Sequence, residues 1–264
     1  MNIHPSLQPA VDQLAAYEAE IASLRVRDRM FVRKQDMLPE CRPYRLLGAN
    51  VLWANWPTDN DELPDKAHVQ QVIQADTSQP YVINIEHWHW DIRHHPIAEV
   101  DATIEKIVTI LEWCREANPD GDYGIYALCM LRDYHSPVKE RDLDEWYAAN
   151  DYLKPIRDAS DSLYPSIYTF YEDREGWEKY AKANIAECVR VSEGKPVRPF
   201  WWPRYHTSNK TVGGQLIEAD YLKLQLDIMA DQPIDAIYAW DLWSQSSAWE
   251  SELRETCRQW ARGE

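Results

Sequence analysis

The sequence lacks several features that would assign it to a familiar class at once. None of its apolar runs reaches the roughly 18 residues that a membrane-spanning helix needs. Residues 1–13 lack a basic segment followed by an apolar one, so we expect no export signal there. The location therefore stays open between the cytoplasm, as the default, and secretion after removal of a signal peptide.

Basic residues are scarce, with 28 Lys and Arg against 44 Asp and Glu and a formal net charge of −16 at pH 7. Such a charge repels nucleic acids and anionic membranes over a screening length of about 8–10 Å. We therefore expect no nucleic-acid partner and no membrane partner. A dense polyanion is disfavoured as a ligand for the same reason, whereas a neutral or weakly charged ligand is not.

Cysteine pairs in the CxxC pattern are absent. The five cysteines are scattered along the chain, at Cys41, Cys114, Cys129, Cys188 and Cys257. This spacing fits neither a disulfide framework nor a cysteine zinc site, so we expect no metal and no cofactor.

Phenylalanine is rare, at 3 residues, whereas tryptophan and tyrosine are common, at 13 and 15. Trp and Tyr join a flat apolar face to a polar edge, which suits stacking on sugar rings whose hydroxyls need hydrogen bonds. The alternative is that these side chains fill a large core, which accounts for part of them. The composition thus favours a carbohydrate ligand.

The N-terminal stretch from about Ser6 to Asp36 has the pattern of one long helix. Apolar side chains recur in it at spacings of three and four, at Leu7, Val11, Leu14, Tyr17, Ile21 and Leu24. We expect residues 1–40 to form an N-terminal helical arm. Its apolar stripe must be buried, either in a homodimer paired through this helix or against the outside of the protein's own barrel.

Strand-type and helix-type runs alternate over residues 41–264. The strand-type runs are RLLGANVLWANW, YVINIEHW, YGIYALC, SLYPSIYTF, PVRPFWWPRY and AIYAWDLW, and the helical ones include IAEVDATIEKIVTILEWCREA, EGWEKYAKANIAECVRVSEG and EADYLKLQLDIMAD. The alternation predicts an α/β fold, a TIM-like (β/α) barrel with parallel strands inside and helices outside. Fewer than eight strands are clear, so either another strand lies within 63–80 or the barrel is incomplete.

In such barrels the catalytic groups lie at the carboxyl ends of the strands. One strand run ends in Asn84-Ile85-Glu86, and since side chains alternate along a strand, Asn84 and Glu86 face the same way. A carboxyl and an amide aimed into one pocket can protonate a leaving oxygen while holding a polar group of the substrate.

Several strand ends resemble, in order along the chain, those of the hyaluronidase family of glycoside hydrolases. The matching segments are NVLWANWP (50–57), INIEHW (83–88), GIYAL (124–128), LYPSIY (163–168), PFWWPRY (199–205) and IYAWD (237–241), and LYPSIY is the most specific. The resemblance implies a barrel enzyme that cleaves a polysaccharide or oligosaccharide internally.

The resemblance also implies roles for individual residues. Glu86 falls on the family's general acid/base, Tyr168 on a tyrosine beside the cleavage site, and Trp240 on the tryptophan beneath it. Asn84 replaces the family's aspartate, which orients the substrate's own 2-acetamido group as the nucleophile. An Asn-x-Glu pair is similar to that of certain endo-β-N-acetylglucosaminidases, so substrate-assisted retaining catalysis at an N-acetylhexosamine remains the expected mechanism.

Two departures make hyaluronan specificity doubtful. Leu128 stands where the family has a site tyrosine, and the segment between Trp56 and Tyr81 is short. We expect the substrate contacts to come from strand-end aromatic and basic side chains, namely Trp53, Trp88, Tyr126, Trp201, Trp202, Arg204, Tyr205 and Trp240.

Three alternatives remain open. Asp241, which follows Trp240 at a strand end, could act with Glu86 in a two-carboxylate glycosidase. The change at Asn84 could instead leave a catalytically inactive carbohydrate-binding barrel. A metal site at His87 and His89, which share a strand face, is disfavoured because that face lies opposite to Glu86.

Overall fold

The computed structural model describes residues 30–33, 42–53, 62–77, 80–128, 130–241 and 255. The helix expected over residues 6–36 falls outside these ranges, except at 30–33. A homodimer formed through that helix is therefore also outside the part of the chain that the structure describes.

A six-stranded parallel sheet forms the centre of the described structure. Its strands are β1 (Met30–Arg33), β2 (Arg42–Gly48), β3 (Tyr81–Asn84), β4 (Tyr123–Ile125), β5 (Phe200–Trp201) and β6 (Ile237–Ala239). They lie in the order β4-β3-β2-β1-β6-β5, and every neighbouring pair is parallel. All carboxyl ends thus meet at one edge of the sheet, where Gly48 of β2 pairs with Asn84 of β3.

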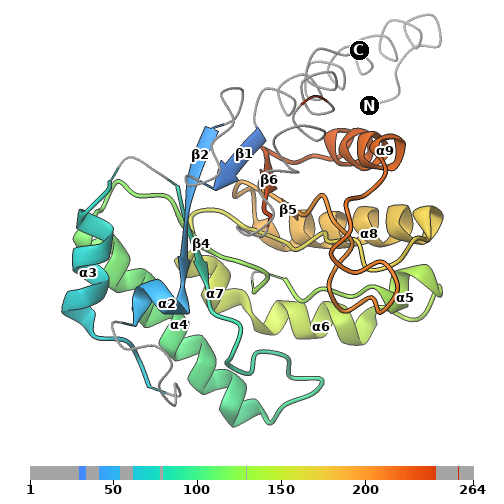
Figure 1. Cartoon of the computed structure of the whole chain (residues 1–264). Coiled ribbons are helices and arrows are strands. Elements are labelled where there is room, and N and C mark those ends of the chain that lie inside the picture. Colours follow the sequence, from blue (N-terminus) through green and yellow to red (C-terminus); the bar gives the residue numbers. More distant parts are fainter. Residues whose placement is uncertain are drawn as a thin grey trace, which may run out of the picture.

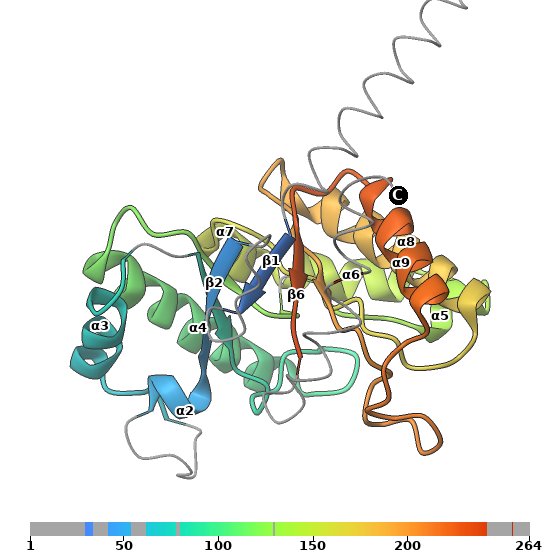
Figure 2. The ribbon, with the colours of Figure 1, turned by 45° about the horizontal axis from the view of Figure 1, so that its top comes forward.

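Helices connect the strands and lie outside the sheet (Figure 1). They are α2 (Ala49–Leu52), α3 (Lys66–Gln74), α4 (Ile97–Ala117), α5 (His135–Val138), α6 (Asp144–Tyr152), α7 (Lys154–Ala159), α8 (Arg174–Ser192) and α9 (Ala219–Ala230). In Figures 1 and 2, α3 and α4 lie together at one end of the molecule, and α8 and α9 lie together at the other. No helix in the described ranges is both long enough and apolar enough to cross a membrane.

The predicted α/β class is confirmed, but the described strands are short and form no closed barrel. Residues 163–169 lie between the two edge strands and make isolated parallel bridges to both sides, Tyr126 with Tyr164 and Ser166 with Phe200. The Ala127 N–H donates to the Tyr164 carbonyl at 3.0 Å, and the Ile167 N–H donates to the Phe200 carbonyl at 2.8 Å. The predicted strand around LYPSIY therefore links the edges through single bridges rather than a continuous ladder.

The three long helices predicted from periodicity are confirmed, since α4, α8 and α9 match the predicted runs to within two residues. The predicted helix over residues 6–36 and the predicted strand run over residues 45–56 were each wrong in part. Residues 30–33 form β1 rather than helix, because pairing with β2 and β6 satisfies their backbone on both sides. Residues 49–52, within the predicted strand run 45–56, form α2. Of the two alternatives left open, the further strand does not occur in the described part of 63–80, where residues 66–74 form α3, because Asp65 caps the His68 N–H at 2.8 Å and Val69 and Ile73, four residues apart, are buried together.

Much of the aromatic content fills the core, as the alternative interpretation of the composition predicted. The largest fully buried side chains are all tryptophans and tyrosines, at Trp146, Trp177, Trp201, Tyr81, Tyr123, Tyr164, Tyr180, Tyr221 and Tyr238. Burial raises the pKa of Tyr238 to about 12, so its phenol stays neutral at any physiological pH.

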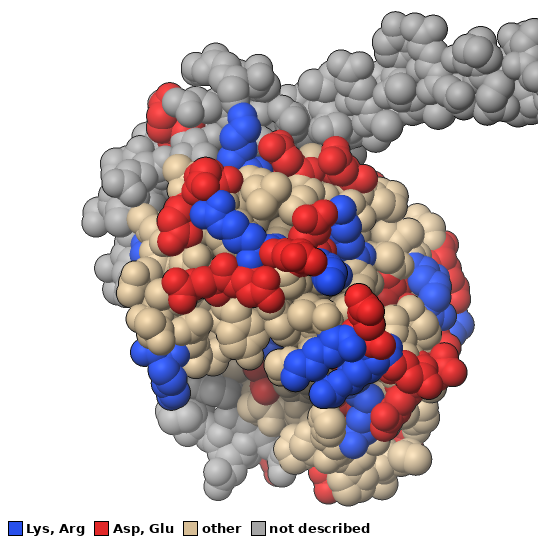
Figure 3. Space-filling model, turned by 90° about the vertical axis from the view of Figure 1, so that its right-hand side faces the viewer, with Lys and Arg blue, Asp and Glu red and all other residues tan. Residues whose placement is uncertain are grey.

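Charges of both signs are mixed on the face that Figure 3 shows, so this face carries no extended patch of one sign. Exposed ion pairs on α8 and α9 follow helical spacing, as between Lys179 and Glu175 (3.2 Å), or join the two helices, as between Arg174 and Asp220 (2.8 Å). Exposed pairs of this kind contribute little to stability, so the fold depends on its core.

Gly124 of β4 provides a test of the close packing between β4 and residues 162–164. A Cβ atom at this position would collide with the Ser162 carbonyl and the ring of Tyr164. We expect Gly124→Ala to lower the free energy of unfolding by about 1–3 kcal/mol, measured by urea denaturation. In the control Gly48→Ala, the Cβ meets only the end of the Asn50 side chain, at 2.8 Å, so the loss should be smaller. Equal losses would contradict this packing.

Candidate active site

A cavity of about 340 Å³ opens at the carboxyl ends of the strands. Six of the predicted site residues line it, and they come from the ends of β3, β4, β5 and β6 and from the bridging segment 163–169: Asn84, Glu86, Tyr126, Tyr168, Trp202 and Trp240. The remaining lining residues are Leu46, Arg132, Phe200, His206 and Thr207. The cavity therefore combines one carboxyl and one amide with a mainly aromatic wall.

Asn84 and Glu86 lie side by side in this cavity. Asn84 ends β3, and its Nδ2 donates a hydrogen bond to Glu86 Oε1 at 2.9 Å. Asn84 Oδ1 is buried and has no hydrogen-bond partner among the described residues. A buried acceptor without a partner costs about 1–3 kcal/mol, and a bound molecule that donates an N–H or O–H would remove this cost. The pair thus places one carboxyl and one buried, unsatisfied acceptor beside the cavity.

The aromatic wall is built around Tyr168. Its ring lies nearly parallel to that of Trp240 (centroids 6.1 Å apart, 24° between planes) and edge-on to that of Trp202 (5.6 Å, 61°). Tyr126 lies 5.9 Å from Tyr168 and donates its hydroxyl to Ser166 Oγ at 3.0 Å. Burial raises the pKa of Tyr126, so its hydroxyl remains a neutral donor. Flat faces with polar edges of this kind suit a sugar ring.

His206 closes one side of the cavity and is packed between aromatic rings, 6.1 Å from Tyr168 and 4.7 Å from Phe170. Burial lowers the pKa of His206, the positive charge of Arg132 lowers it further, and Glu86 opposes this shift. The imidazole is therefore neutral at neutral pH and offers a hydrogen-bonding group without charge.

Arg132 is the basic residue of the cavity, and we did not predict it from the sequence. Buried asparagines fix the backbone on either side of it: the Leu131 N–H donates to Asn150 Oδ1 at 2.7 Å, and the Asp133 N–H donates to Asn184 Oδ1 at 3.0 Å. Its guanidinium lies 4.5 Å from the Phe170 ring centre. No ion pair engages it within the described ranges. Only its place in a polar loop after a strand could have indicated it.

The other six predicted site residues lie outside the cavity lining: Trp53, Trp88, Trp201, Arg204, Tyr205 and Asp241. Alternation along the strands explains part of this, since Trp202 faces the cavity while Trp201 faces outward and donates to Gln225 Oε1 of α9 at 2.8 Å. Tyr205 donates to Glu218 Oε2 at 2.9 Å. Trp53 and Trp88 are buried against each other, with ring centroids 5.8 Å apart.

Asp241 and Arg204 form a buried ion pair behind the cavity wall. Arg204 Nε donates to Asp241 Oδ1 at 2.7 Å and Arg204 Nη2 donates to Oδ2 at 3.2 Å, while Trp202 Nε1 donates to Oδ1 at 3.0 Å. Both carboxylate oxygens are therefore occupied. Asp241 orients Trp202 through this hydrogen bond and directly follows Trp240 in the sequence. The ion pair therefore supports two of the cavity's aromatic side chains.

One group of candidate metal ligands occurs in the described ranges, at His89, His95 and Glu99. Two of its members, His89 and Glu99, line a different cavity from the one that contains Asn84. His87, which we had paired with His89 in the disfavoured metal hypothesis, packs instead against Trp53, with ring centroids 5.5 Å apart.

Comparison with solved structures relates this fold to bee venom hyaluronidase. A crystal structure of that enzyme superposes with a TM-score of 0.64 at 13% sequence identity, covering 82% of this chain and 88% of the other. Its complex with a hyaluronic acid tetramer gives a TM-score of 0.62 at 15% identity, covering 83% and 87%. At this identity the likeness concerns the fold. No protein-family model matches the chain, and no curated protein sequence matches it.

The buried ion pair predicts a large stability effect. Arg204→Met leaves the Asp241 carboxylate buried without its cation, so we expect a loss of about 3–5 kcal/mol in the free energy of unfolding, measured by urea denaturation. The matched change Lys182→Met removes an exposed partner of Glu178 and should cost much less. Adding Asp241→Asn to Arg204→Met should recover part of the loss. An equal effect of the two single changes would show that the Arg204 pair does not support the fold.

Proposed function

We propose that the protein is a glycoside hydrolase that cleaves a polysaccharide or oligosaccharide internally, at an N-acetylhexosamine, with Glu86 as general acid/base. The observation that supports this most directly is the Asn84 and Glu86 pair at the end of β3, with Asn84 Oδ1 buried and unpartnered among the described residues. The fold shared with bee venom hyaluronidase agrees with it.

In the proposed first step, the substrate's acetamide oxygen attacks the anomeric carbon, while the bond from that carbon to the leaving oxygen breaks. Protonated Glu86 gives its proton to the leaving oxygen. Asn84 Oδ1 accepts the acetamide N–H, which holds the acetamide oxygen towards the anomeric carbon. In the second step, Glu86 takes a proton from water, whose oxygen bonds to the anomeric carbon and releases the acetamide. Two displacements return the original configuration.

The wall of the cavity suits the sugar that this scheme requires. Tyr168 and Trp240 present nearly parallel faces, and Trp202 meets both edge-on. His206 is neutral, and Arg132 supplies one positive charge. One cation beside neutral hydrogen-bonding groups fits a neutral or weakly charged glycan, in agreement with the net charge of −16.

The arrangement of Asp241 favours substrate assistance over the two-carboxylate alternative. A catalytic nucleophile or base needs a free oxygen directed at the substrate or its water, whereas both Asp241 oxygens accept hydrogen bonds from Arg204 and one also accepts from Trp202. Asp241 also lies outside the cavity lining. Among the described residues, Glu86 is then the only carboxyl that lines the cavity, which favours a nucleophile supplied by the substrate.

Substitutions of the pair test this mechanism. Glu86→Gln removes the proton donor, and we expect kcat on N-acetylated oligosaccharides to fall by about 10²–10⁴-fold, with binding retained. Asn84→Ala removes the acetamide acceptor and should also abolish most turnover. Asn84→Asp keeps an acceptor oxygen of the same reach and should retain activity.

De-acetylated counterparts of the same oligosaccharides serve as the control, and wild-type protein should leave them uncut. Equal cleavage of both sets would contradict substrate assistance and revive the two-carboxylate scheme. Glycan binding without cleavage of any substrate would favour the inactive carbohydrate-binding protein. Undiminished activity of Glu86→Gln would remove Glu86 from the chemistry.

A further inference from the structure

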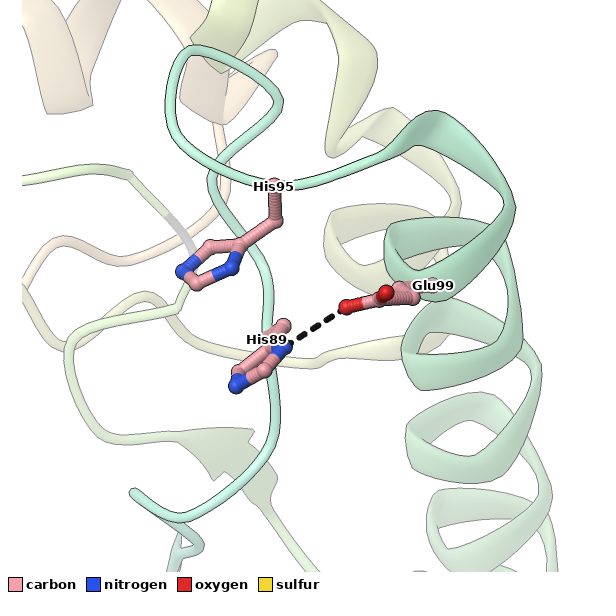
Figure 4. A group of neighbouring side chains, drawn as sticks. All are labelled: His89, His95 and Glu99. Atoms are coloured by element: carbon pink, nitrogen blue, oxygen red, sulfur yellow. Dashed lines mark hydrogen bonds and ion pairs between the residues drawn. The ribbon is translucent and has the colours of Figure 1, made fainter.

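The loop between β3 and α4 brings two histidines and a glutamate together on the surface (Figure 4). His89 Nδ1 lies 2.8 Å from Glu99 Oε2, and one possible ligand atom from each of His89, His95 and Glu99 falls within 4.8 Å of the others. The two imidazole rings stack at 3.9 Å, with 15° between their planes. Two imidazole nitrogens and a carboxylate oxygen are a ligand set that zinc accepts with three protein ligands and one open position.

The backbone of this loop is already fixed in a shape that keeps the three side chains together. Both the His94 and the His95 N–H groups donate to the Asp91 carbonyl at 3.0 Å. The Asp91 side chain accepts from the Arg93 N–H at 2.9 Å and pairs with the Arg93 guanidinium at 2.7 Å. Glu99 lies in the first turn of α4, directly after this turn. Binding of an ion therefore needs to order little of the loop backbone.

We propose that His89, His95 and Glu99 bind a divalent transition-metal ion of the zinc class. Imidazole nitrogen suits zinc, copper and nickel ions, whereas magnesium and calcium prefer sites made of oxygen ligands alone. The lone pairs of imidazole lie in the ring plane, so one ring must rotate out of the stack to share an ion with the other. This rotation meets little packing, because the side chains of His89 and Glu99 are 53% and 52% exposed.

The ion would act as a clip between the loop and α4, apart from the hydrolytic chemistry. His89 and Glu99 line their own cavity of about 480 Å³, in which neither Asn84 nor Glu86 takes part. Lys106 lines the same cavity and carries a charge that opposes a cation. Its ammonium lies over the Trp88 ring, 5.0 Å from the ring centre, and is thereby held by a different partner.

Zinc chloride titrated into the full chain, followed by isothermal titration calorimetry, tests the site. We expect one saturable site in the wild-type chain, and no binding of magnesium chloride. His95→Ala and His89→Ala should each weaken zinc binding by at least about 10-fold, as expected for loss of a ligand. The matched control is His94→Ala, which removes a neighbouring histidine that is 71% exposed and lies outside the cluster. The zinc affinity of this variant should equal that of the wild type. Lys106→Gln should bind zinc as tightly as the wild type or more tightly.

Thermal unfolding gives a second readout that does not depend on any enzymatic activity. Zinc should raise the Tm of the wild type and of His94→Ala, but not that of His95→Ala. Circular dichroism without metal checks that each variant is folded. Wild-type affinity in His95→Ala would place the zinc elsewhere, for instance on cysteines, and would overturn the proposal, as would the absence of saturable zinc binding in the wild type. Failure of the proposed hydrolase activity would leave both readouts unaffected.

Discussion

The hydrogen bond between Asn84 Nδ2 and Glu86 Oε1 is the interaction on which the candidate site depends. It exists because side chains two residues apart at the end of β3 face the same way. Because this bond uses the amide nitrogen, Asn84 Oδ1 stays a buried acceptor with no partner among the residues that the structure describes. An unsatisfied acceptor of this kind weakens the unliganded protein and strengthens binding of any ligand that supplies a donor there. The site thus carries a built-in preference for a molecule with an N–H or O–H at that point.

The aromatic wall depends on groups that never enter the cavity. The Arg204 and Asp241 pair holds Trp202, and buried asparagines of α6 and α8 hold the backbone around Arg132. The edges of the sheet approach each other only through single bridges of residues 163–169, the segment that carries Tyr168. The aromatic wall therefore depends on side-chain hydrogen bonds where few backbone hydrogen bonds join the strands. A substitution behind the wall can alter the shape of the cavity even though the substituted residue does not line it.

Sequence patterns predicted those parts of the protein that long periodicity or strand alternation controls. The apolar side chains of α4 recur over many turns, so their pattern predicted where this helix begins and ends. Strand alternation predicted that Asn84 and Glu86 face the same way. Prediction failed where a few residues decide the structure. Only four residues form β1, and their strand conformation depends on pairing with β2 and with β6, which lies near the other end of the chain.

In the candidate site too, residues set by local sequence patterns were predicted, whereas residues set by contacts between distant segments were not. Trp201 and Trp202 are adjacent, and choosing which faces the cavity needs the phase of a strand only two residues long. Arg132 lies in a loop whose course is set by asparagines that are distant in sequence, at Asn150 and Asn184. Neither assignment could be made from local patterns, because both depend on contacts between separate elements.

In the proposed mechanism the substrate's acetamide oxygen is the nucleophile, and Asn84 holds the acetamide through its N–H. The rate of cleavage across a series of substrates that differ only in fluorination of the N-acyl group, from acetyl to trifluoroacetyl, measures this directly. Fluorine withdraws electrons from the acyl oxygen, so we expect kcat to fall steeply and progressively along the series. A rate that is independent of fluorination would contradict this mechanism, because a protein carboxylate would then be the attacking group.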